Sequence, residues 1–245
     1  MLAIDVGNTR IKWGIWQQNV LEQKGASNYR SEQLEEDLDQ CFAPLLQQDS
    51  VYACCVSSEQ VQLSLHQWFQ RQWGVNVHFI ESQSQLMGVR NGYDDPHQMG
   101  ADRWVAMIAA YTKYQKAVCV IDCGTAITLD IVSAQGQHLG GLIMPGLDMM
   151  KNALYMGTRR IKPAIGDLCD LGMNTADAVT SGCYQLLVNG LQGLVVKHSA
   201  AVEGDLLCVV TGGNAELLVR ENQIHCCHDA DLILYGLNVI ANIKK

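Results

Sequence analysis

Apolar positions along the chain follow two periodicities. Short apolar runs predict β-strands, and longer segments in which apolar residues recur every three or four positions predict amphipathic helices. The predicted strands are Leu2–Ile4, Ile11–Trp16, Val20–Leu21, Val51–Val56, Val75–Ile80, Val118–Ile121, Ile127–Val132, Leu139–Met144 and Leu206–Val210. The predicted helices are Ser31–Gln47, Glu59–Trp73 and Ala101–Tyr114, and two long helical stretches follow before the last strand. This mixture of elements is typical of an α/β fold.

The pattern of the first strands returns near the middle of the chain. Ile4–Thr9 resembles Ile121–Ala126, and Asp5 and Asp122 lie 117 residues apart. Each copy has an apolar strand, an aspartate, a glycine turn, an alternating strand and a third strand. A chance likeness of two buried strands is the alternative for either copy alone, but the shared order favours duplication. We therefore expect two similar α/β halves, residues 1–115 and 116–245.

Composition limits the classes of function. With 245 residues, of which 48% are hydrophobic, the chain can bury a sizeable core. A net charge of −8 with only 17 Lys and Arg argues against non-specific nucleic-acid binding, which needs clustered cations. No run approaches the ~18 apolar residues of a membrane span. Asp5 falls where a secretory leader would be apolar, so we expect a cytoplasmic protein.

Ten cysteines are scattered along the chain, and none forms a CxxC pair. In a chain of this size most are expected to be buried thiols in a reducing compartment. The run His225-Cys226-Cys227-His228 could suggest a metal site. Because four consecutive side chains alternate in direction, they cannot easily close one tetrahedron, and we do not assign a metal there.

Asp5 and Asp122 each follow a buried strand and precede a glycine turn. Ligands of α/β folds bind at the carboxyl ends of such strands. Gly7 and Gly124 would let main-chain amides approach phosphate oxygens, and nearby hydroxyls and Lys12 could add donors. Two such loops could clamp a polyphosphate, with both carboxylates holding hydrated Mg²⁺. The alternative for each turn alone is an ordinary Asx-turn.

The best candidate for a general base is Asp102, in the hexapeptide Met99–Trp104 at the start of a predicted helix. The helix N-terminus favours an ionised carboxylate, which could accept a hydroxyl proton during phosphoryl transfer. Its neighbour Arg103 could bind an anionic group. Helix capping with a surface ion pair is the alternative. Tyr93, in the polar loop just before, could close over a substrate or be an ordinary loop aromatic.

Two further segments carry weaker signals. Thr175 precedes a predicted helix start, where it could cap the helix, contact a ligand, or do both. The turn Thr211–Ala215 contains two glycines and could lie against a nucleoside, although a simple strand-to-helix turn is equally consistent with it.

Taken in order, these segments resemble the type III pantothenate kinases of the acetate and sugar kinase/Hsp70/actin superfamily. The resemblance spans nearly the whole chain. It rests on Asp5–Lys12, Asn91–Tyr93 with Gly100–Trp104, Asp122–Ala126 with Gly140–Gly146, Asn174–Thr175, Thr211–Ala215 and Leu234–Leu237. It implies two tandem actin-like (ribonuclease H-like) halves, each a mixed sheet with flanking helices. The two departures are Met99, where Leu is more usual, and Asn214, where Asp is common.

The resemblance also implies a reaction and roles for residues. The expected activity is ATP-dependent phosphorylation of pantothenate to 4′-phosphopantothenate, the first step of coenzyme A biosynthesis, with Asp102 as proton acceptor. ATP would be bound by Asp5, Val6, Gly7, Asn8, Thr9, Arg10, Ile11, Lys12 and Thr125. Pantothenate would be bound by Tyr93, Gly100, Ala101, Asp102, Arg103 and Thr175.

The cation assignment changes under the resemblance. Asp122 is expected to hold a monovalent cation, K⁺ or NH₄⁺, in addition to the Mg²⁺ that accompanies ATP. A homodimer is expected, with Thr175 acting from the partner chain. The alternatives are another small-molecule kinase of the same superfamily, or a nucleotide-binding regulator without catalysis. The regulator is disfavoured because Asp5, Asp102 and Asp122 are all present.

Overall fold

The computed structural model describes residues 1–219 and 226–243. The chain divides into two compact units. The first unit comprises residues 1–113 together with 231–245, and the second comprises residues 114–230. The final segment therefore belongs with the first unit, whereas the sequence analysis placed it in the second half. Each unit is described below by itself.

The first unit contains a five-stranded mixed sheet in the order β3-β2-β1-β4-β5. Its strands are β1 (Leu2–Val6), β2 (Arg10–Gln17), β3 (Val20–Asn28), β4 (Val51–Cys55) and β5 (Val77–Phe79). The three N-terminal strands form an antiparallel meander, and β4 and β5 then pair parallel to β1. The central strand β1 is buried on both faces, which explains its continuous apolar sequence.

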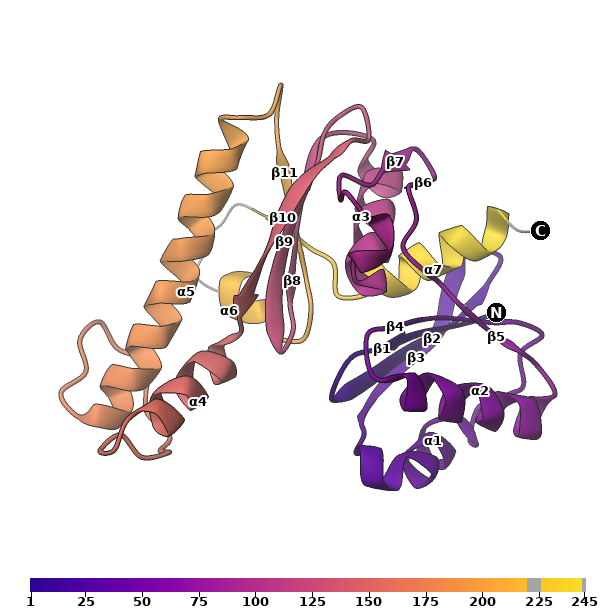
Figure 1. Ribbon diagram of the computed structural model, residues 1–245, viewed down its shortest axis with the longest axis horizontal. Coiled ribbons are helices and arrows are strands. Elements are labelled where there is room, and N and C mark those ends of the chain that lie inside the picture. Colours follow the sequence, from indigo (N-terminus) through magenta and orange to yellow (C-terminus); the bar gives the residue numbers. More distant parts are fainter. Residues whose placement is uncertain (220–225, 244–245) are drawn as a thin grey trace. The chain divides into compact units, whose positions relative to one another are not determined.

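Helices cover both faces of this sheet. The helices α1 (Leu34–Phe42) and α2 (Glu59–Trp73) lie on one face (Figure 1), where Phe42, Trp68 and Phe69 form an aromatic cluster in the core. The helix α7 (Leu232–Ile243) packs on β1, β2 and β4 from the other face. The 3₁₀ turns η1 (Ser31–Gln33) and η2 (Pro96–Gln98) and the short hairpin β6 (Gln85–Leu86) and β7 (Val89–Arg90) complete the unit.

The C-terminal helix α7 is held in the first unit by close packing on α3 (Ala101–Tyr114). A Cβ at Gly236 would lie 2.7 Å from both Val105 Cγ1 and the Val105 carbonyl oxygen, so only glycine allows this approach. Asn238, buried in α7, donates to Asn19 in the β2–β3 turn. These contacts explain why the final segment joins the first unit.

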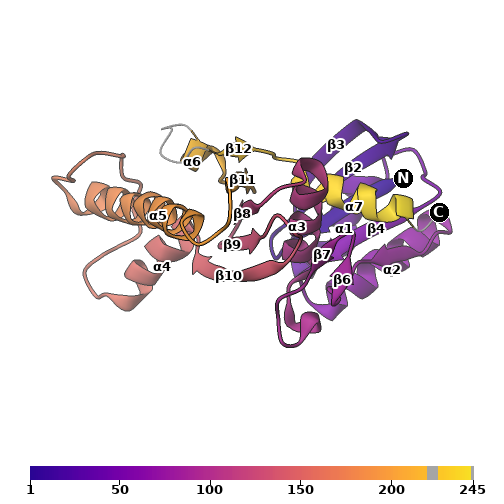
Figure 2. The ribbon, with the colours of Figure 1, turned by 90° about the horizontal axis from the view of Figure 1, so that it is seen from above.

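The second unit repeats the same sheet order. Its strands run β10-β9-β8-β11-β12, which is the order of the first sheet with each strand replaced by its counterpart. They are β8 (Val118–Cys123), β9 (Ala126–Val132), β10 (His138–Pro145), β11 (Leu207–Thr211) and β12 (Cys227–His228). The helices are α4 (Leu147–Gly157), α5 (Thr175–Ser199) and α6 (Glu216–Val219). Figure 2 shows α4 and α5 side by side, and α5 packs through Tyr184, Leu187 and Leu191 on the sheet core.

The predicted duplication is visible in this shared topology. Asp5 and Asp122 are each the penultimate residue of the central strand of their sheet. The α/β class, most predicted strands and the helices at Glu59–Trp73 and Ala101–Tyr114 agree with the structure. The predicted helix Ser31–Gln47 was too long. It ends at Phe42. The Ala43 amide still donates to the Asp39 carbonyl, but Pro44, the next residue, has no N–H with which to continue the helix.

Two general expectations can also be compared with the structure. All ten cysteines are free thiols, and seven of them are buried. Within residues 1–219 and 226–243, no helix combines the length and apolar character needed to cross a lipid bilayer.

Candidate active site

The first glycine turn joins β1 to β2 and presents its tip to solvent. The Gly7 amide donates to the Arg10 carbonyl (3.0 Å), which closes the turn, and Asn8, Thr9 and Arg10 are exposed. The flanking side chains of Val6 and Ile11 lie in the core. A ligand at this turn can therefore contact only their main chain, whereas the three residues at the tip can offer side chains as well.

Asp5 lies beside this turn in a crowded part of the sheet. Lys12 on β2 and Cys54 on β4 are its register partners, so all three side chains project from the same face. The Cys54 thiol donates to Asp5 Oδ1 at 3.4 Å. Burial raises the pKa of Asp5 from 3.8 to about 6, Lys12 and the Cys54 thiol oppose this rise, and the Asp102 carboxylate adds to it. Lys12 and Cys54 thus do not fully offset the unfavourable burial of the negative charge on Asp5.

Asp102 is held at the first turn of α3 in the same unit. Its Oδ1 accepts from the Arg103 amide at 2.7 Å, and the Trp104 amide donates to the Gly100 carbonyl at 3.1 Å. A Cβ at Gly100 would lie 2.6 Å from Asp102 Oδ1, so glycine at this position leaves the space that the carboxylate occupies. The sequence-predicted residues Asp5, Lys12, Gly100 and Asp102 are therefore brought together in one unit.

Tyr93 and Arg103 meet beside Asp102. The Arg103 guanidinium is buried and donates to the Tyr93 hydroxyl at 2.7 Å, and its Cζ lies 5.5 Å from the centre of the Tyr93 ring. Asn91 shapes the loop by accepting from the Tyr93 amide at 3.0 Å. The side-chain amide of Asn91 also donates to Met99 Sδ at 3.7 Å. Met99, which stands where Leu is more usual, therefore accepts a hydrogen bond within this loop. Together these contacts fix the loop that precedes α3.

The second glycine turn, Cys123–Thr125, follows β8 in the other unit. Two main-chain amides bind its carbonyls: Gly146 donates to Thr125 (3.1 Å) and Asn214 donates to Cys123 (2.9 Å). A Cβ at Gly146 would collide with the Thr125 carbonyl, and one at Gly212 (φ +97°) would collide with Asp122 Oδ1. The departure Asn214 is accommodated because this contact uses only its main chain. Thr125 is exposed at the tip.

Asp122 has different neighbours from Asp5. Its register partners are Thr128 on β9 and Thr211 on β11, so two hydroxyls share its face of the sheet. Thr211 is buried. Oxygen donors of this kind are the ligands that hard cations take in proteins. No cluster of three or more His, Cys, Asp or Glu side chains that could hold a metal was found among the described residues. His225 of the His225–His228 run lies outside the described residues.

Thr175 is the first residue of α5, whose N-cap is its neighbour Asn174. The Asn174 side chain accepts from the Asp177 amide at 3.0 Å, so capping does not occupy the Thr175 hydroxyl. Thr175 lines a groove of about 660 Å³ between α4 and α5. The groove is otherwise apolar and begins at Pro145, next to Gly146 of the second turn. Thr175 thus lies at a predominantly apolar surface.

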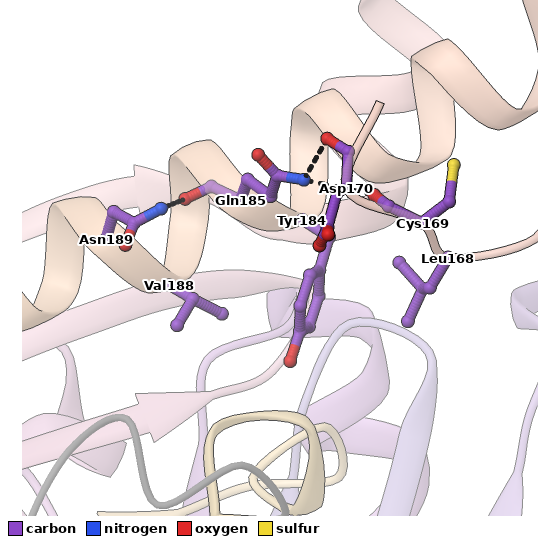
Figure 3. A pocket seen from close by; sticks show the side chains of 7 residues that line it. All are labelled: Leu168, Cys169, Asp170, Tyr184, Gln185, Val188 and Asn189. Carbon is purple, nitrogen blue, oxygen red and sulfur yellow. Dashed lines mark hydrogen bonds between the residues drawn. The ribbon is translucent and has the colours of Figure 1, made fainter. Parts of the chain in front are cut away.

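A second cavity of the same unit contains none of the predicted site residues. It measures about 340 Å³ and lies where residues 168–170 run along α5 (Figure 3). Gln185 donates to the carbonyls of Cys169 (3.1 Å) and Asp170 (2.9 Å) across it. The hydrogen bonds tie this segment to α5, and we assign the cavity a structural role.

Sequence reasoning missed two residues near the first turn. Tyr29 contacts the turn through its hydroxyl and its amide, and Cys54 contacts Asp5. Cys54 could have been found from the predicted strands once β4 is placed beside β1. Tyr29 follows an edge strand with mostly polar, exposed residues, and no periodicity points to it.

Comparison with known proteins adds an independent result. The family model described as type III pantothenate kinase matches residues 1–197. A type III pantothenate kinase of Nitrosococcus oceani is 34% identical over 250 residues, covering 98% of this chain and 93% of that protein. One from Pseudomonas aeruginosa is 36% identical over 255 residues and covers 100% of both chains.

Solved structures share the fold at lower identity. A Campylobacter jejuni protein assigned to the Baf family of transcriptional activators has a TM-score of 0.62 at 23% identity, covering 100% of this chain and 98% of that one. A ROK family glucokinase from Streptomyces griseus, in complex with glucose and AMPPNP, has a TM-score of 0.55 at 11% identity and covers 99% of each chain. These likenesses confirm the expected actin-like α/β fold.

The raised pKa of Asp5 predicts a specific pH dependence of stability. A carboxyl with a higher pKa in the folded than in the unfolded state stabilises the fold at low pH and loses that contribution as the pH rises. Asn cannot titrate, so the wild type and Asp5→Asn are compared without ligands. As the pH rises from about 4.5 to 7.5, the free energy of unfolding of the wild type should fall by about 2 kcal/mol relative to that of Asp5→Asn. Urea unfolding of both proteins measures it, and a difference that stays constant with pH would contradict the burial of Asp5.

Proposed function

The chain belongs to the type III pantothenate kinase family, and we propose roles for its residues in the reaction of that family. It is an ATP-dependent pantothenate kinase, which transfers the γ-phosphoryl group of ATP to the primary hydroxyl of pantothenate and forms 4′-phosphopantothenate in coenzyme A biosynthesis. ATP is used with Mg²⁺. This membership favours pantothenate phosphorylation over the two alternatives, another small-molecule kinase of the same superfamily or a non-catalytic nucleotide-binding regulator.

In the proposed mechanism, Asp102 is the general base. The pantothenate hydroxyl oxygen forms a bond to the γ-phosphorus while the bond from that phosphorus to the β,γ-bridging oxygen breaks, and ADP leaves with the electron pair. The hydroxyl proton passes to Asp102. The observation that carries this assignment is the placement of the Asp102 carboxylate over Gly100 at the N-terminus of α3, close enough to Asp5 to affect its pKa.

We assign ATP binding to Asp5–Lys12 and Thr125. The exposed tip of the first turn offers main-chain amides, the Thr9 hydroxyl and the Arg10 side chain, while Val6 and Ile11 contribute main chain only. Asp5 would hold the hydrated Mg²⁺ that accompanies ATP, and the ion would neutralise charge on the phosphates. The raised pKa of Asp5 supports this role, because burial and the nearby Asp102 carboxylate make its negative charge unfavourable and a cation would offset it.

Pantothenate is assigned to Tyr93, Gly100–Arg103 and Thr175. The pair formed by the Arg103 guanidinium and the Tyr93 hydroxyl places a buried cation and a phenol beside Asp102. This arrangement could orient a carboxylate-bearing substrate relative to the base. Thr175 offers a hydroxyl at the rim of the α4–α5 groove.

Asp122 would hold a monovalent cation, K⁺ or NH₄⁺. The Thr128 and Thr211 hydroxyls opposite Asp122 fit this assignment, since the site offers several oxygens but one formal charge. The cation would offset negative charge of the bound nucleotide.

A cytoplasmic homodimer is also part of the proposal. The α4–α5 groove and its surroundings expose an unusually apolar surface for a monomer, and we assign a second copy of the chain as its occupant. Met149 and Leu186 line the groove and are exposed, and the same unit also exposes Ile143, Met156, Ile165, Leu168, Leu171 and Met173. Since Thr175 lines the same groove, dimerisation through it would bring Thr175 to the subunit interface.

Replacing the base tests the mechanism. Asp102→Asn keeps the shape of the side chain but cannot accept the proton, so kcat should fall roughly 100-fold or more. The KM values for ATP and pantothenate should change much less. A coupled assay of ADP release with ATP, Mg²⁺ and pantothenate measures all three parameters.

The matched control for this substitution is Asp49→Asn, which makes the same chemical change in an exposed loop. It should retain wild-type turnover. Near-normal kcat in Asp102→Asn would exclude Asp102 as the base, and thermal unfolding of the variant shows whether a loss of activity reflects a loss of fold.

The cation assignment predicts a change in potassium dependence. In Asp122→Asn, the KCl concentration that gives half-maximal activity should rise about tenfold or more, because the carboxylate that attracts the cation is neutralised. The measurement is a KCl titration at constant ionic strength with tetramethylammonium chloride. An unchanged potassium response would show that Asp122 does not hold the cation.

The dimer assignment predicts an effect of charge in the groove. Leu186 is 67% exposed there, and Leu186→Glu should shift the protein toward monomers by burying an unpaired carboxylate. Leu46→Glu, at a leucine 83% exposed in the first unit, is the control and should not affect assembly. Sedimentation equilibrium measures the mass. A monomeric wild type, or a Leu186→Glu protein that remains dimeric, would exclude this interface.

A further inference from the structure

Tyr29, which follows the edge strand β3, holds the first turn at two points. Its amide donates to the Thr9 carbonyl at 3.2 Å, and its hydroxyl donates to the Gly7 carbonyl at 2.7 Å. The third bond of the turn runs from the Gly7 amide to the Arg10 carbonyl. The turn therefore depends on a side chain that lies 22 positions away in the sequence.

The bond to Gly7 affects the direction of the next amide. A trans peptide group is planar, so the Gly7 carbonyl and the Asn8 N–H point in opposite directions. When the carbonyl is bound by Tyr29, the Asn8 N–H must point away from Tyr29. In a turn that binds phosphate through main-chain amides, the direction of these N–H groups decides how well they meet the phosphate oxygens.

The Tyr29 hydroxyl is itself held in place. Ser57 Oγ lies 2.8 Å from it, just beyond the end of β4. The phenol has one hydrogen and the Gly7 carbonyl can only accept, so the Ser57 hydroxyl is the donor in this second bond. Tyr29 is 6% exposed, and burial raises the pKa of its hydroxyl, which therefore stays protonated and able to donate.

The second turn reaches a comparable arrangement by other means. There, the carbonyls of Cys123 and Thr125 accept from the main-chain amides of Asn214 and Gly146. In both units the carbonyls of the glycine turn are thus bound by the surrounding protein. Among the described residues, a side-chain hydroxyl supplies one of these bonds in the first unit alone.

We propose that Tyr29, braced by Ser57, is a positioning residue that orients the amides of the first turn for the phosphates of ATP. Tyr29 would act through the Gly7 carbonyl, to which its hydroxyl donates. This inference rests on the proposed role of the first turn in ATP binding. It goes beyond that role because Tyr29 and Ser57 lie outside every segment that carries the family resemblance.

The test is Tyr29→Phe, which removes the hydroxyl and keeps the ring in the core. The KM for ATP should rise roughly 3- to 10-fold, as expected for the loss of one hydrogen bond. The KM for pantothenate should stay within twofold of the wild type. Tyr52→Phe is the matched control: Tyr52 is a buried tyrosine of the same sheet whose hydroxyl makes no hydrogen bond within the described residues.

Two outcomes would overturn the proposal. One is a KM for ATP in Tyr29→Phe that matches the Tyr52→Phe control. The other is an equal rise in both KM values with a melting temperature well below the control, which would indicate a purely structural role. Ser57→Ala, measured in parallel, should raise the KM for ATP in the same direction by a smaller factor, and it provides the test if Tyr29→Phe does not fold. An unchanged KM for ATP in Ser57→Ala would then exclude the proposal.

Lys12→Met separates this inference from the function on which it rests. Lys12 belongs to the first turn region itself, and methionine keeps its apolar stem. If the turn binds ATP but Tyr29 does not orient it, Lys12→Met raises the KM for ATP and Tyr29→Phe does not. If neither variant alters the KM for ATP, the assignment of the first turn to ATP is wrong.

Discussion

A carboxylate near the end of the central strand is the constraint that each half of this fold must accommodate. Asp5 and Asp122 occupy the same penultimate position, beside a glycine turn and between two flanking strands. Burying Asp5 raises its pKa to about 6 even with Lys12 opposite it. The free protein therefore tolerates an unfavourable group, and a bound cation would relieve it. A carboxylate whose pKa is shifted by burial and by a neighbouring charge is typical of a binding site.

The two halves surround this carboxylate differently, although they share one strand order. Asp5 has a cationic and a thiol partner, and Asp122 has two hydroxyls. The first set leaves Asp5 with one cationic neighbour and one weak thiol donor. The second set places neutral hydroxyl oxygens beside one carboxylate. The two halves thus share backbone positions, while the side chains at the register positions differ in chemistry.

Much of the fold could be predicted because strand and helix periodicities are local. The buried central strands and the helices 59–73 and 101–114 show this. The end of α1 was missed although Pro44 marks it, and the long polar strand β3 was reduced to its first residues because an edge strand buries little. The placement of α7 in the first unit depends on Gly236 meeting Val105, a contact between distant segments that no local pattern encodes.

The same limit applies to the site. Charged residues beside glycines, such as Asp5, Asp102 and Asp122, are noticeable in a sequence. Burying a charged side chain costs free energy, so its presence at the end of an apolar segment points to a function. Residues that orient the main chain do not stand out: Tyr29 is one tyrosine among eight, and its role follows only from the two carbonyls it binds. When hydrogen-bond donors elsewhere in the protein bind the carbonyls of a glycine turn, the N–H groups of the same peptides point the opposite way and can face a ligand. Those donors come from residues that only the folded chain brings to the turn, so their positions in the sequence do not reveal them.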